Sequence, residues 1–138
     1  MPYKLLVTDD NEYIIEALQR RLKLEGFEVI TASDGEDALQ KMDAEDPDIV
    51  LLDLNMPKMN GFEVLMEIKR RNEIELNRVR PVIIISAKDE AEAREEGLQL
   101  TETECFLNKP CSIEEILGAI RKMIGMLSKV KPLTEDGV

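Results

Sequence analysis

The sequence is short of the residues that most often carry acid–base and redox chemistry. It has no histidine and no tryptophan, and only two cysteines among 138 residues. The absence of histidine excludes histidine-based general-base catalysis, and it excludes this chain as a phosphohistidine carrier. Cys105 and Cys111 have neither CxxC nor metal-type spacing and are too few for a disulfide framework. We therefore expect reduced thiols that pack within the fold.

Positive charge and long apolar runs are also scarce. Lysine and arginine number 18 against 29 aspartates and glutamates, which gives a formal net charge of -11. This balance argues against a nucleic-acid partner, because phosphate backbones are bound by clustered lysine and arginine. No segment approaches the roughly 20 apolar residues of a membrane span, and Met1–Lys4 lacks the layout of a secretory signal. We expect a cytoplasmic protein with no membrane partner.

What the sequence does contain is a fivefold alternation of short apolar runs with helical periodicity. This alternation is typical of an α/β fold, in which a parallel sheet is flanked by helices. The third run is apolar almost throughout, as expected of a central strand, whereas the second is more polar and is expected at an edge. The predicted strands are Lys4–Thr8, Phe27–Ala32, Asp48–Asp53, Pro81–Ser86 and Glu104–Asn108.

Capping residues and apolar spacing predict a helix after each strand. Capping boxes are expected at Ser33 and Ser112, an N-cap at Asn60, and a weakly patterned fourth helix around Glu90–Leu98. The predicted inward residues are Ile14, Ala17, Leu18 and Leu22; Ala38, Leu39 and Met42; Phe62, Leu65 and Met66; and Ile113, Ile116, Leu117, Ile120, Ile124 and Leu127.

The length of the chain favours one domain. We place that domain at residues 1–129, followed by a short polar tail at residues 130–138, within a polar stretch that begins at Ser128. Asn72–Arg80 is expected to be a long polar connection before the fourth strand.

Polar side chains follow four of the predicted strands. Asp9 and Asp10 end the first, Asp53 the third, Ser86 the fourth, and Lys109 follows the fifth. In a parallel sheet these residues converge at the carboxyl edge, where open α/β folds place their ligand sites. Three carboxylates, a hydroxyl and an ammonium at one edge indicate a magnesium-dependent phosphoryl site.

This arrangement, together with the stretch Asp53-Leu54-Asn55-Met56-Pro57-Lys58-Met59-Asn60-Gly61, resembles the receiver domain of bacterial two-component response regulators (CheY-like). The resemblance runs from about Lys4 to about Lys129. It implies a flavodoxin-like fold with five parallel strands in the order 2-1-3-4-5. It also implies a stand-alone response regulator that switches partner binding and catalyses only its own phosphoryl transfer and autodephosphorylation.

The resemblance assigns a role to each site residue. Asp53 would be the phosphoacceptor. Asp10 and Asp53 would bind Mg²⁺, or Mn²⁺ as a substitute, through side-chain oxygens, Asn55 through its backbone carbonyl, and Asp9 largely through water. Adjacent carboxylates such as Asp9 and Asp10 are unfavourable unless a cation neutralises them, which is consistent with this assignment.

The remaining roles concern the phosphoryl group and the response to it. Lys109 would contact one phosphoryl oxygen and the Ser86 hydroxyl another. Ser86 and Phe106 would form a switch in which the aromatic ring turns inward as the hydroxyl moves. Lys88 and Asn55 would flank the path of the attacking water and tune the phosphoryl lifetime.

The implied partners are a sensor histidine kinase or a histidine phosphotransfer protein and a downstream protein target, with a phosphorylation-linked dimer as a further possibility. Three segments depart from the common receiver pattern and lie where receivers engage partners. They are Asn72–Arg80, Gly97–Cys105 and Cys111, the last in place of an aromatic residue.

Several alternatives remain at this point. An aspartate-based phosphatase or phosphotransferase would have Asp-x-Asp-x-Thr at the first strand and an acid where this chain has Asn55. A flavin- or nucleotide-binding module would need a Gly-, Ser- or Thr-rich cradle where this chain has Asp9-Asp10-Asn11. A docking-only pseudo-receiver would lack the complete set of site residues. An intermediate relay receiver would pass the group to a histidine phosphotransfer protein.

Overall fold

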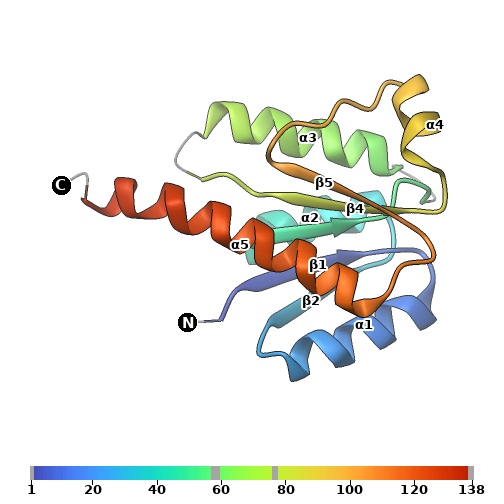
Figure 1. Cartoon of the computed structure of the whole chain (residues 1–138), viewed down its shortest axis with the longest axis horizontal. Helices are drawn as coiled ribbons and strands as arrows, with labels where there is room; N and C mark the ends of the chain where they lie inside the picture. Colours follow the sequence, from blue (N-terminus) through green and yellow to red (C-terminus); the bar gives the residue numbers. More distant parts are fainter. Residues whose placement is uncertain (1, 57–59, 76–77, 137–138) are drawn as a thin grey trace.

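Five parallel strands form one twisted sheet in the order β2-β1-β3-β4-β5 (Figure 1). The computed structural model describes residues 2–56, 60–75 and 78–136, with residues 128–136 considered as helix backbone only. The strands are β1 (Lys4–Thr8), β2 (Glu28–Ala32), β3 (Ile49–Leu52), β4 (Val82–Ser86) and β5 (Glu104–Asn108). The predicted fold class and strand order are confirmed.

Two helical layers cover the sheet (Figure 1). On one face, α1 and α5 pack on the alternate residues Leu5, Val7, Leu51 and Ile83, and on the other α2, α3 and α4 pack on Leu6, Val50, Leu52 and Ile84. This alternation follows from the period of two along a strand. The helices are α1 (Glu12–Leu24), α2 (Gly35–Glu45), α3 (Gly61–Ile74), α4 (Glu90–Glu95) and α5 (Ile113–Asp136).

The burial of the strands explains their order. Every residue of β3 and β4 is buried, whereas β2 is exposed or half-buried except at Ala32. A strand covered on both faces must be apolar on both, so the predictions of a central third strand and an edge second strand are confirmed.

The helix starts agree with the predicted caps at two of three positions. The Asn60 side chain accepts a hydrogen bond from the Glu63 amide, and the Ser112 hydroxyl accepts one from the Glu115 amide. The box predicted at Ser33 is wrong by one residue: Asp34 is the N-cap, and its carboxylate accepts from the Asp37 amide at 2.8 Å. An aspartate caps as well as a serine does, so the two adjacent candidates could not be separated by type.

Two residues predicted to face inward are exposed. Met66 of α3 is 48% exposed, and Val64 and Ile68 are buried in its place. Ala17 of α1 is also exposed, and Leu22 is the only fully buried residue of that helix. Apolar residues occur around most of α3, so spacing alone left the direction of its buried face open.

Three predicted strands, Phe27–Ala32, Asp48–Asp53 and Pro81–Ser86, are one residue too long at one or both ends. Three helix ends also differ from the prediction. α3 continues through Asn72 to Ile74, so the connection to β4 is shorter than expected, although residues 76–77 lie outside the described residues. α4 ends at Glu95, before Leu98. The residues expected as a polar tail from Ser128 are helical to Asp136, and α5 projects beyond the sheet (Figure 1).

Among the described residues, no helix combines the length and the apolar character that crossing a bilayer requires.

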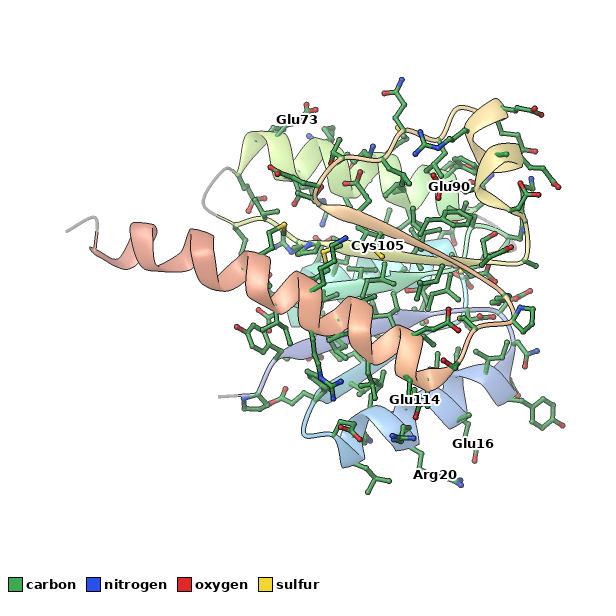
Figure 2. The ribbon with its side chains drawn as sticks, viewed as in Figure 1. Glu16, Arg20, Glu73, Glu90, Cys105 and Glu114 are labelled. Atoms are coloured by element: carbon green, nitrogen blue, oxygen red, sulfur yellow. The ribbon has the colours of Figure 1, made fainter. Side chains whose placement is uncertain are left out.

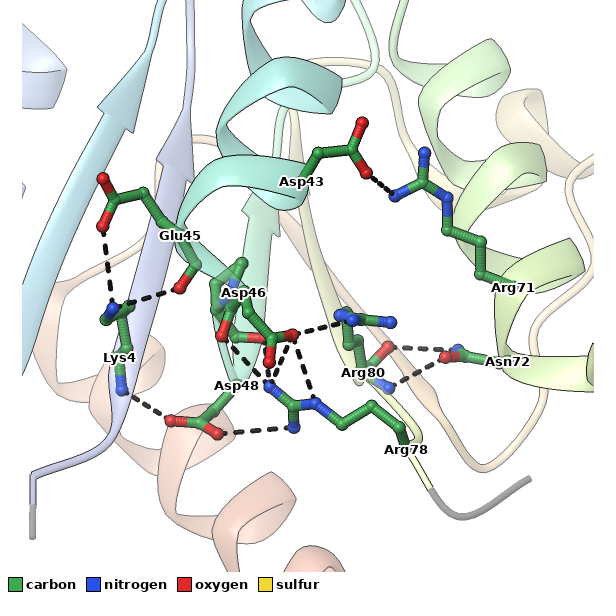
Figure 3. A network of polar contacts seen from close by, with 10 residues as sticks. Lys4, Asp43, Glu45, Asp46, Asp48, Arg71, Asn72, Arg78 and Arg80 are labelled. Carbon is green, nitrogen blue, oxygen red and sulfur yellow. Dashed lines mark hydrogen bonds and ion pairs between the residues drawn. The ribbon is translucent and has the colours of Figure 1, made fainter. Parts of the chain in front are cut away.

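The amino edge of the sheet is fixed by a network of charged groups (Figure 3). Asp46, at the end of α2, accepts hydrogen bonds from Arg78 at 3.0 Å and from Arg80 at 2.7 Å. The Asn72 side chain bonds both the N–H and the C=O of Arg80, at 2.8 and 3.1 Å. Asp48 accepts from the Lys4 amide at 2.8 Å. These bonds hold the ends of α2 and α3 to the starts of β1, β3 and β4.

Candidate functional site

The opposite, carboxyl edge brings together residues far apart in the sequence. The Asp53 amide donates to the Thr8 carbonyl at 3.0 Å, so the residues after β1 and β3 lie side by side. The Lys109 amide donates to the Ser86 carbonyl at 2.7 Å, so the ends of β4 and β5 also lie side by side. The predicted convergence is therefore present in the backbone before any side chain is considered.

Lys109 links two of the predicted carboxylates. Its ammonium lies 2.8 Å from Asp9 Oδ2 and 3.3 Å from Asp53 Oδ2. Asp9 and Asp53 are only 4% and 5% exposed, and a buried carboxylate is costly unless it is paired. The Lys109 ammonium supplies a positive charge that both carboxylates share.

The other oxygen of each buried carboxylate is held by the backbone in the same way. Asp9 Oδ1 accepts from the Asn11 amide at 2.9 Å, and Asp53 Oδ1 accepts from the Asn55 amide at 3.1 Å. In each case the donor is two residues further along the chain, the spacing of an Asx turn. One oxygen of each carboxylate is thus fixed by its own loop while the other points to Lys109.

Asp10 completes a group of three carboxylates. One oxygen from each of Asp9, Asp10 and Asp53 can be chosen so that all three lie within 4.8 Å of one another. Asp10 is exposed, unlike the other two. Magnesium prefers oxygen ligands, keeps several waters and needs few carboxylates, and this group meets those requirements. The donor set therefore fits the expected divalent cation.

Burial and charge shift the ionisation of the central pair. Burial raises the pKa of Asp53, and the nearby charge of Asp9 adds to the rise, whereas the Asn55 amide and the Lys109 ammonium lower it by less. Burial alone would lower the pKa of Lys109, but its hydrogen bond to Asp9 and the charges of both carboxylates raise it. Lys109 is thus firmly protonated, yet one ammonium shared by two carboxylates does not fully offset the burial of Asp53.

Gly61 sets the distance between α3 and the Asp53 backbone. A Cβ at this position would overlap the Asp53 carbonyl oxygen and the Leu54 Cα. The Gly61 amide also donates to the Leu54 carbonyl at 3.0 Å. Only glycine allows this approach, which holds the loop after Asp53 against the start of α3. Residues 57–59 of that loop lie outside the described residues.

Ser86 is fully buried at the end of β4. Its hydroxyl accepts a hydrogen bond from the Lys88 amide at 3.2 Å. The Asn108 side chain donates to the Ser86 and Lys88 carbonyls, at 2.8 and 3.2 Å. The residues between β4 and α4 are thus held to the end of β5 through Asn108.

Phe106 and the cysteines occupy structural positions. Phe106 is half-buried and packs against the core between the sheet and α2, α3 and α4. Its role as a switch stays a prediction. Cys105 lies between the sheet and α5 (Figure 2), and both cysteines are free thiols. Burial raises the pKa of the Cys111 thiol, which is consistent with the expected packing role.

Sequence reasoning missed two residues and one contact that shape this site. Asn11 and Asn108 were not assigned, although asparagine next to a strand end or helix start is a known signal for side-chain to backbone bonds. The direct contact between Asp9 and Lys109 was also missed, because the two residues are 100 positions apart. No local pattern carries that information.

Comparison with known proteins places this geometry in a family. The model of the response regulator receiver domain matches residues 5–121. The chain is 35% identical over 135 residues to the alkaline phosphatase synthesis transcriptional regulatory protein PhoP of Bacillus subtilis, covering 98% of this chain and 54% of that protein. The chain thus spans about half the length of the curated relatives that it matches.

Solved structures agree with this assignment. The chemotaxis response regulator CheY4 of Vibrio cholerae has a TM-score of 0.74 and 29% identity, over 89% of this chain and 99% of that one. TrrA of Thermotoga maritima, solved in complex with Mg²⁺-BeF, has a TM-score of 0.71 and 28% identity, over 88% of this chain and 98% of that one. The chain therefore belongs to the family of receiver domains of two-component response regulators.

Proposed function

We propose that this chain accepts a phosphoryl group on Asp53 from a sensor histidine kinase or a histidine phosphotransfer protein, in a Mg²⁺-dependent reaction. One observation carries the proposal: Asp53 is buried at the carboxyl edge, 3.3 Å from the Lys109 ammonium and within a group of three carboxylates. A buried carboxylate with a raised pKa is costly as a structural group, and such groups cluster at functional sites.

The metal would be held by Asp10, Asp53 and the Asn55 backbone carbonyl, with Asp9 acting through Lys109 and water. Once bound, Mg²⁺ supplies positive charge that neutralises the phosphoryl oxygens, and Mn²⁺ would serve as a substitute. The exposure of Asp10 supports its assignment, because a metal that keeps several waters needs an open side.

The chain's own residues would position and neutralise the transferred group. An Asp53 oxygen forms a bond to phosphorus as the bond from phosphorus to the donor's histidine nitrogen breaks. Lys109 offers a point charge to one phosphoryl oxygen, and the Ser86 hydroxyl donates to another. Such transfer depends mostly on positioning and charge neutralisation, which these two groups would supply together with the cation.

The output would be a change in binding to a downstream protein, with Phe106 turning inward as part of the switch. We propose a cytoplasmic regulator that catalyses only its own phosphorylation and dephosphorylation. The group could alternatively be passed on to a histidine phosphotransfer protein in a relay, and phosphorylation could be linked to dimerisation.

The acceptor assignment is tested with acetyl phosphate and Mg²⁺, followed by intact mass measurement. Wild-type protein should gain one phosphoryl group, and Asp53→Asn should gain none. Removal of Mg²⁺ by EDTA should abolish labelling of the wild type. Equal labelling of wild type and Asp53→Asn would place the acceptor elsewhere.

The output is tested by a pull-down that compares beryllofluoride-loaded protein with Asp53→Asn. Capture of a protein without an accessible phosphorylatable histidine supports a switch. In a separate assay, transfer of phosphorus-labelled phosphate from phosphorylated wild-type protein to the captured histidine protein supports the relay.

A further inference from the structure

Lys88, two residues after Ser86, is tied to the far end of α4. Its ammonium pairs with the Glu96 carboxylate, and the Oε1 distance is 2.6 Å. Glu96 is the C-cap of α4, whereas Lys88 directly precedes the N-cap, Asp89. The ion pair therefore joins the two ends of this helix.

The backbone of Lys88 is fixed beside the site while its side chain points away. The Lys88 amide nitrogen is 3.2 Å from the Ser86 hydroxyl, which places the Lys88 Cα within about 5 Å of that oxygen. The Asn108 amide holds the Lys88 carbonyl at 3.2 Å. A lysine stem is flexible and has four carbons, so the ammonium can turn toward the carboxyl edge without movement of the backbone.

Little of α4 is buried. It has six residues, of which Ala93 alone is buried. A helix this short is not stable in isolation, so it depends on tertiary contacts. The Lys88–Glu96 pair adds a side-chain contact between the end of α4 and the loop that carries Ser86.

We propose that Glu96 is a positioning residue that competes with the phosphoryl group on Asp53 for the Lys88 ammonium. This inference rests on the proposed function above. Before phosphorylation, Glu96 holds Lys88 away from the site. A phosphoryl group adds about 1.5 to 2 negative charges at neutral pH, and the ammonium then turns toward it, which frees Glu96 and the end of α4.

A matched pair of variants on the same helix tests this. Glu90 is in the first turn of α4 (Figure 2), and its carboxylate pairs at 2.7 Å with Arg94, four residues further along the same helix. Glu96→Gln removes an ion-paired carboxylate from the C-cap of α4, and Glu90→Gln removes one from its first turn. The measurement is a beryllofluoride titration at fixed Mg²⁺, followed by NMR of backbone amides.

Glu96→Gln should bind beryllofluoride about two- to fivefold more tightly than wild type, the range expected for loss of a partly exposed ion pair. Glu90→Gln should bind beryllofluoride with the affinity of the wild type. Glu96→Asp keeps a carboxylate, so its affinity should be close to that of the wild type. In a Lys88→Met background, Glu96→Gln should have no effect.

Three results decide the matter. Equal affinities for Glu96→Gln and Glu90→Gln would overturn the inference. Tightening that persists in the Lys88→Met background would also overturn it, because it would reflect a loosened helix and not a released ammonium. Failure of the wild type to bind beryllofluoride would instead refute the proposed function, and the inference with it.

Discussion

The Lys109 ammonium lies closer to Asp9, at 2.8 Å, than to the expected acceptor Asp53, at 3.3 Å. Asp9 therefore anchors the lysine. Asp9 directly follows β1, which pairs with β3, the strand that precedes Asp53. This arrangement has a consequence for the acceptor. Because Lys109 is held by a second carboxylate, it keeps its position when the charge on Asp53 changes.

The first prediction concerns Asp9→Asn. The change removes the nearer partner of Lys109 and one carboxylate of the group of three, so the affinity for Mg²⁺ should fall by roughly tenfold or more. Isothermal titration calorimetry with Mg²⁺ measures the fall. Asp43→Asn is the control, because Asp43 pairs with Arg71 at 2.9 Å on an exposed surface, and it should bind Mg²⁺ like the wild type. Unchanged affinity in Asp9→Asn would remove Asp9 from the site.

The second prediction concerns the stability of Asp53→Asn without metal. Burial raises the folded-state pKa of Asp53 above its unfolded value, so the fold favours the protonated carboxyl at low pH. The free energy of unfolding then falls as pH rises from the unfolded pKa through the folded pKa, because the buried group ionises. At pH 7 the ionised group is a cost, and Asn should raise the free energy of unfolding by on the order of 1 kcal/mol. Urea denaturation in EDTA measures this.

Saturating Mg²⁺ provides the control for that experiment. It should stabilise the wild type, because a ligand that binds only the folded state adds to its stability. Asp53→Asn should gain much less. A variant that is less stable than wild type in EDTA, or equally stabilised by Mg²⁺, would contradict the account given for Asp53.

The third prediction concerns Gly61→Ala. The added Cβ would overlap the Asp53 and Leu54 backbone, so the variant should lose about 1–3 kcal/mol of unfolding free energy and bind Mg²⁺ more weakly. Gly118→Ala in α5 is the matched control, because a Cβ there meets nothing within 4 Å. It should stabilise the helix by about 0.5–1 kcal/mol. Equal effects of the two substitutions would show that the close approach at Gly61 is unimportant.

The fourth prediction concerns acid stability and Glu104. Burial tends to raise the pKa of Glu104, but hydrogen bonds from Thr103 and Thr101 and the charge of Lys69 together bring it below 4.5. The ionised Glu104 carboxylate therefore adds to the free energy of unfolding above its unfolded pKa. This contribution is lost as pH falls through the lower folded pKa. Glu104→Gln should be about 2 kcal/mol less stable at pH 7, because it breaks a buried pair with Lys69.

The difference between wild type and Glu104→Gln should narrow as pH falls below about 4.5. Chemical denaturation at a series of pH values follows it. Glu16→Gln is the control, since Glu16 pairs with Arg20 on the exposed side of α1 (Figure 2), and it should cost less than about 0.5 kcal/mol at any pH. A constant difference for Glu104→Gln down to strongly acidic pH would contradict the pKa assignment.

The strands were predictable because their signal is local and strong. The runs Val82–Ile85 and Ile49–Leu52 are apolar on both faces, which is the composition expected of strands covered on both sides. The buried faces and ends of the helices were harder to predict from the sequence. Met66 was placed inward because α3 has apolar residues on most of its circumference, and the sheet decides which of them it buries. Asp34 displaced Ser33 as the cap because adjacent capping residues have similar preferences.

The order of residue types along the chain was enough to specify a parallel sheet and to put Asp9, Asp10, Asp53, Ser86 and Lys109 at one edge of it. That much follows from strand direction, because a parallel strand delivers its last residue to the same edge as its neighbours. The pairing of Lys109 with Asp9, the closeness of Gly61 to the Asp53 carbonyl and the ion pair between Lys88 and Glu96 were decided only when the chain folded. The first two contacts join separate elements and the third joins the two ends of one helix. The distances in all three depend on how the chain packs in space, which no local pattern of residues encodes.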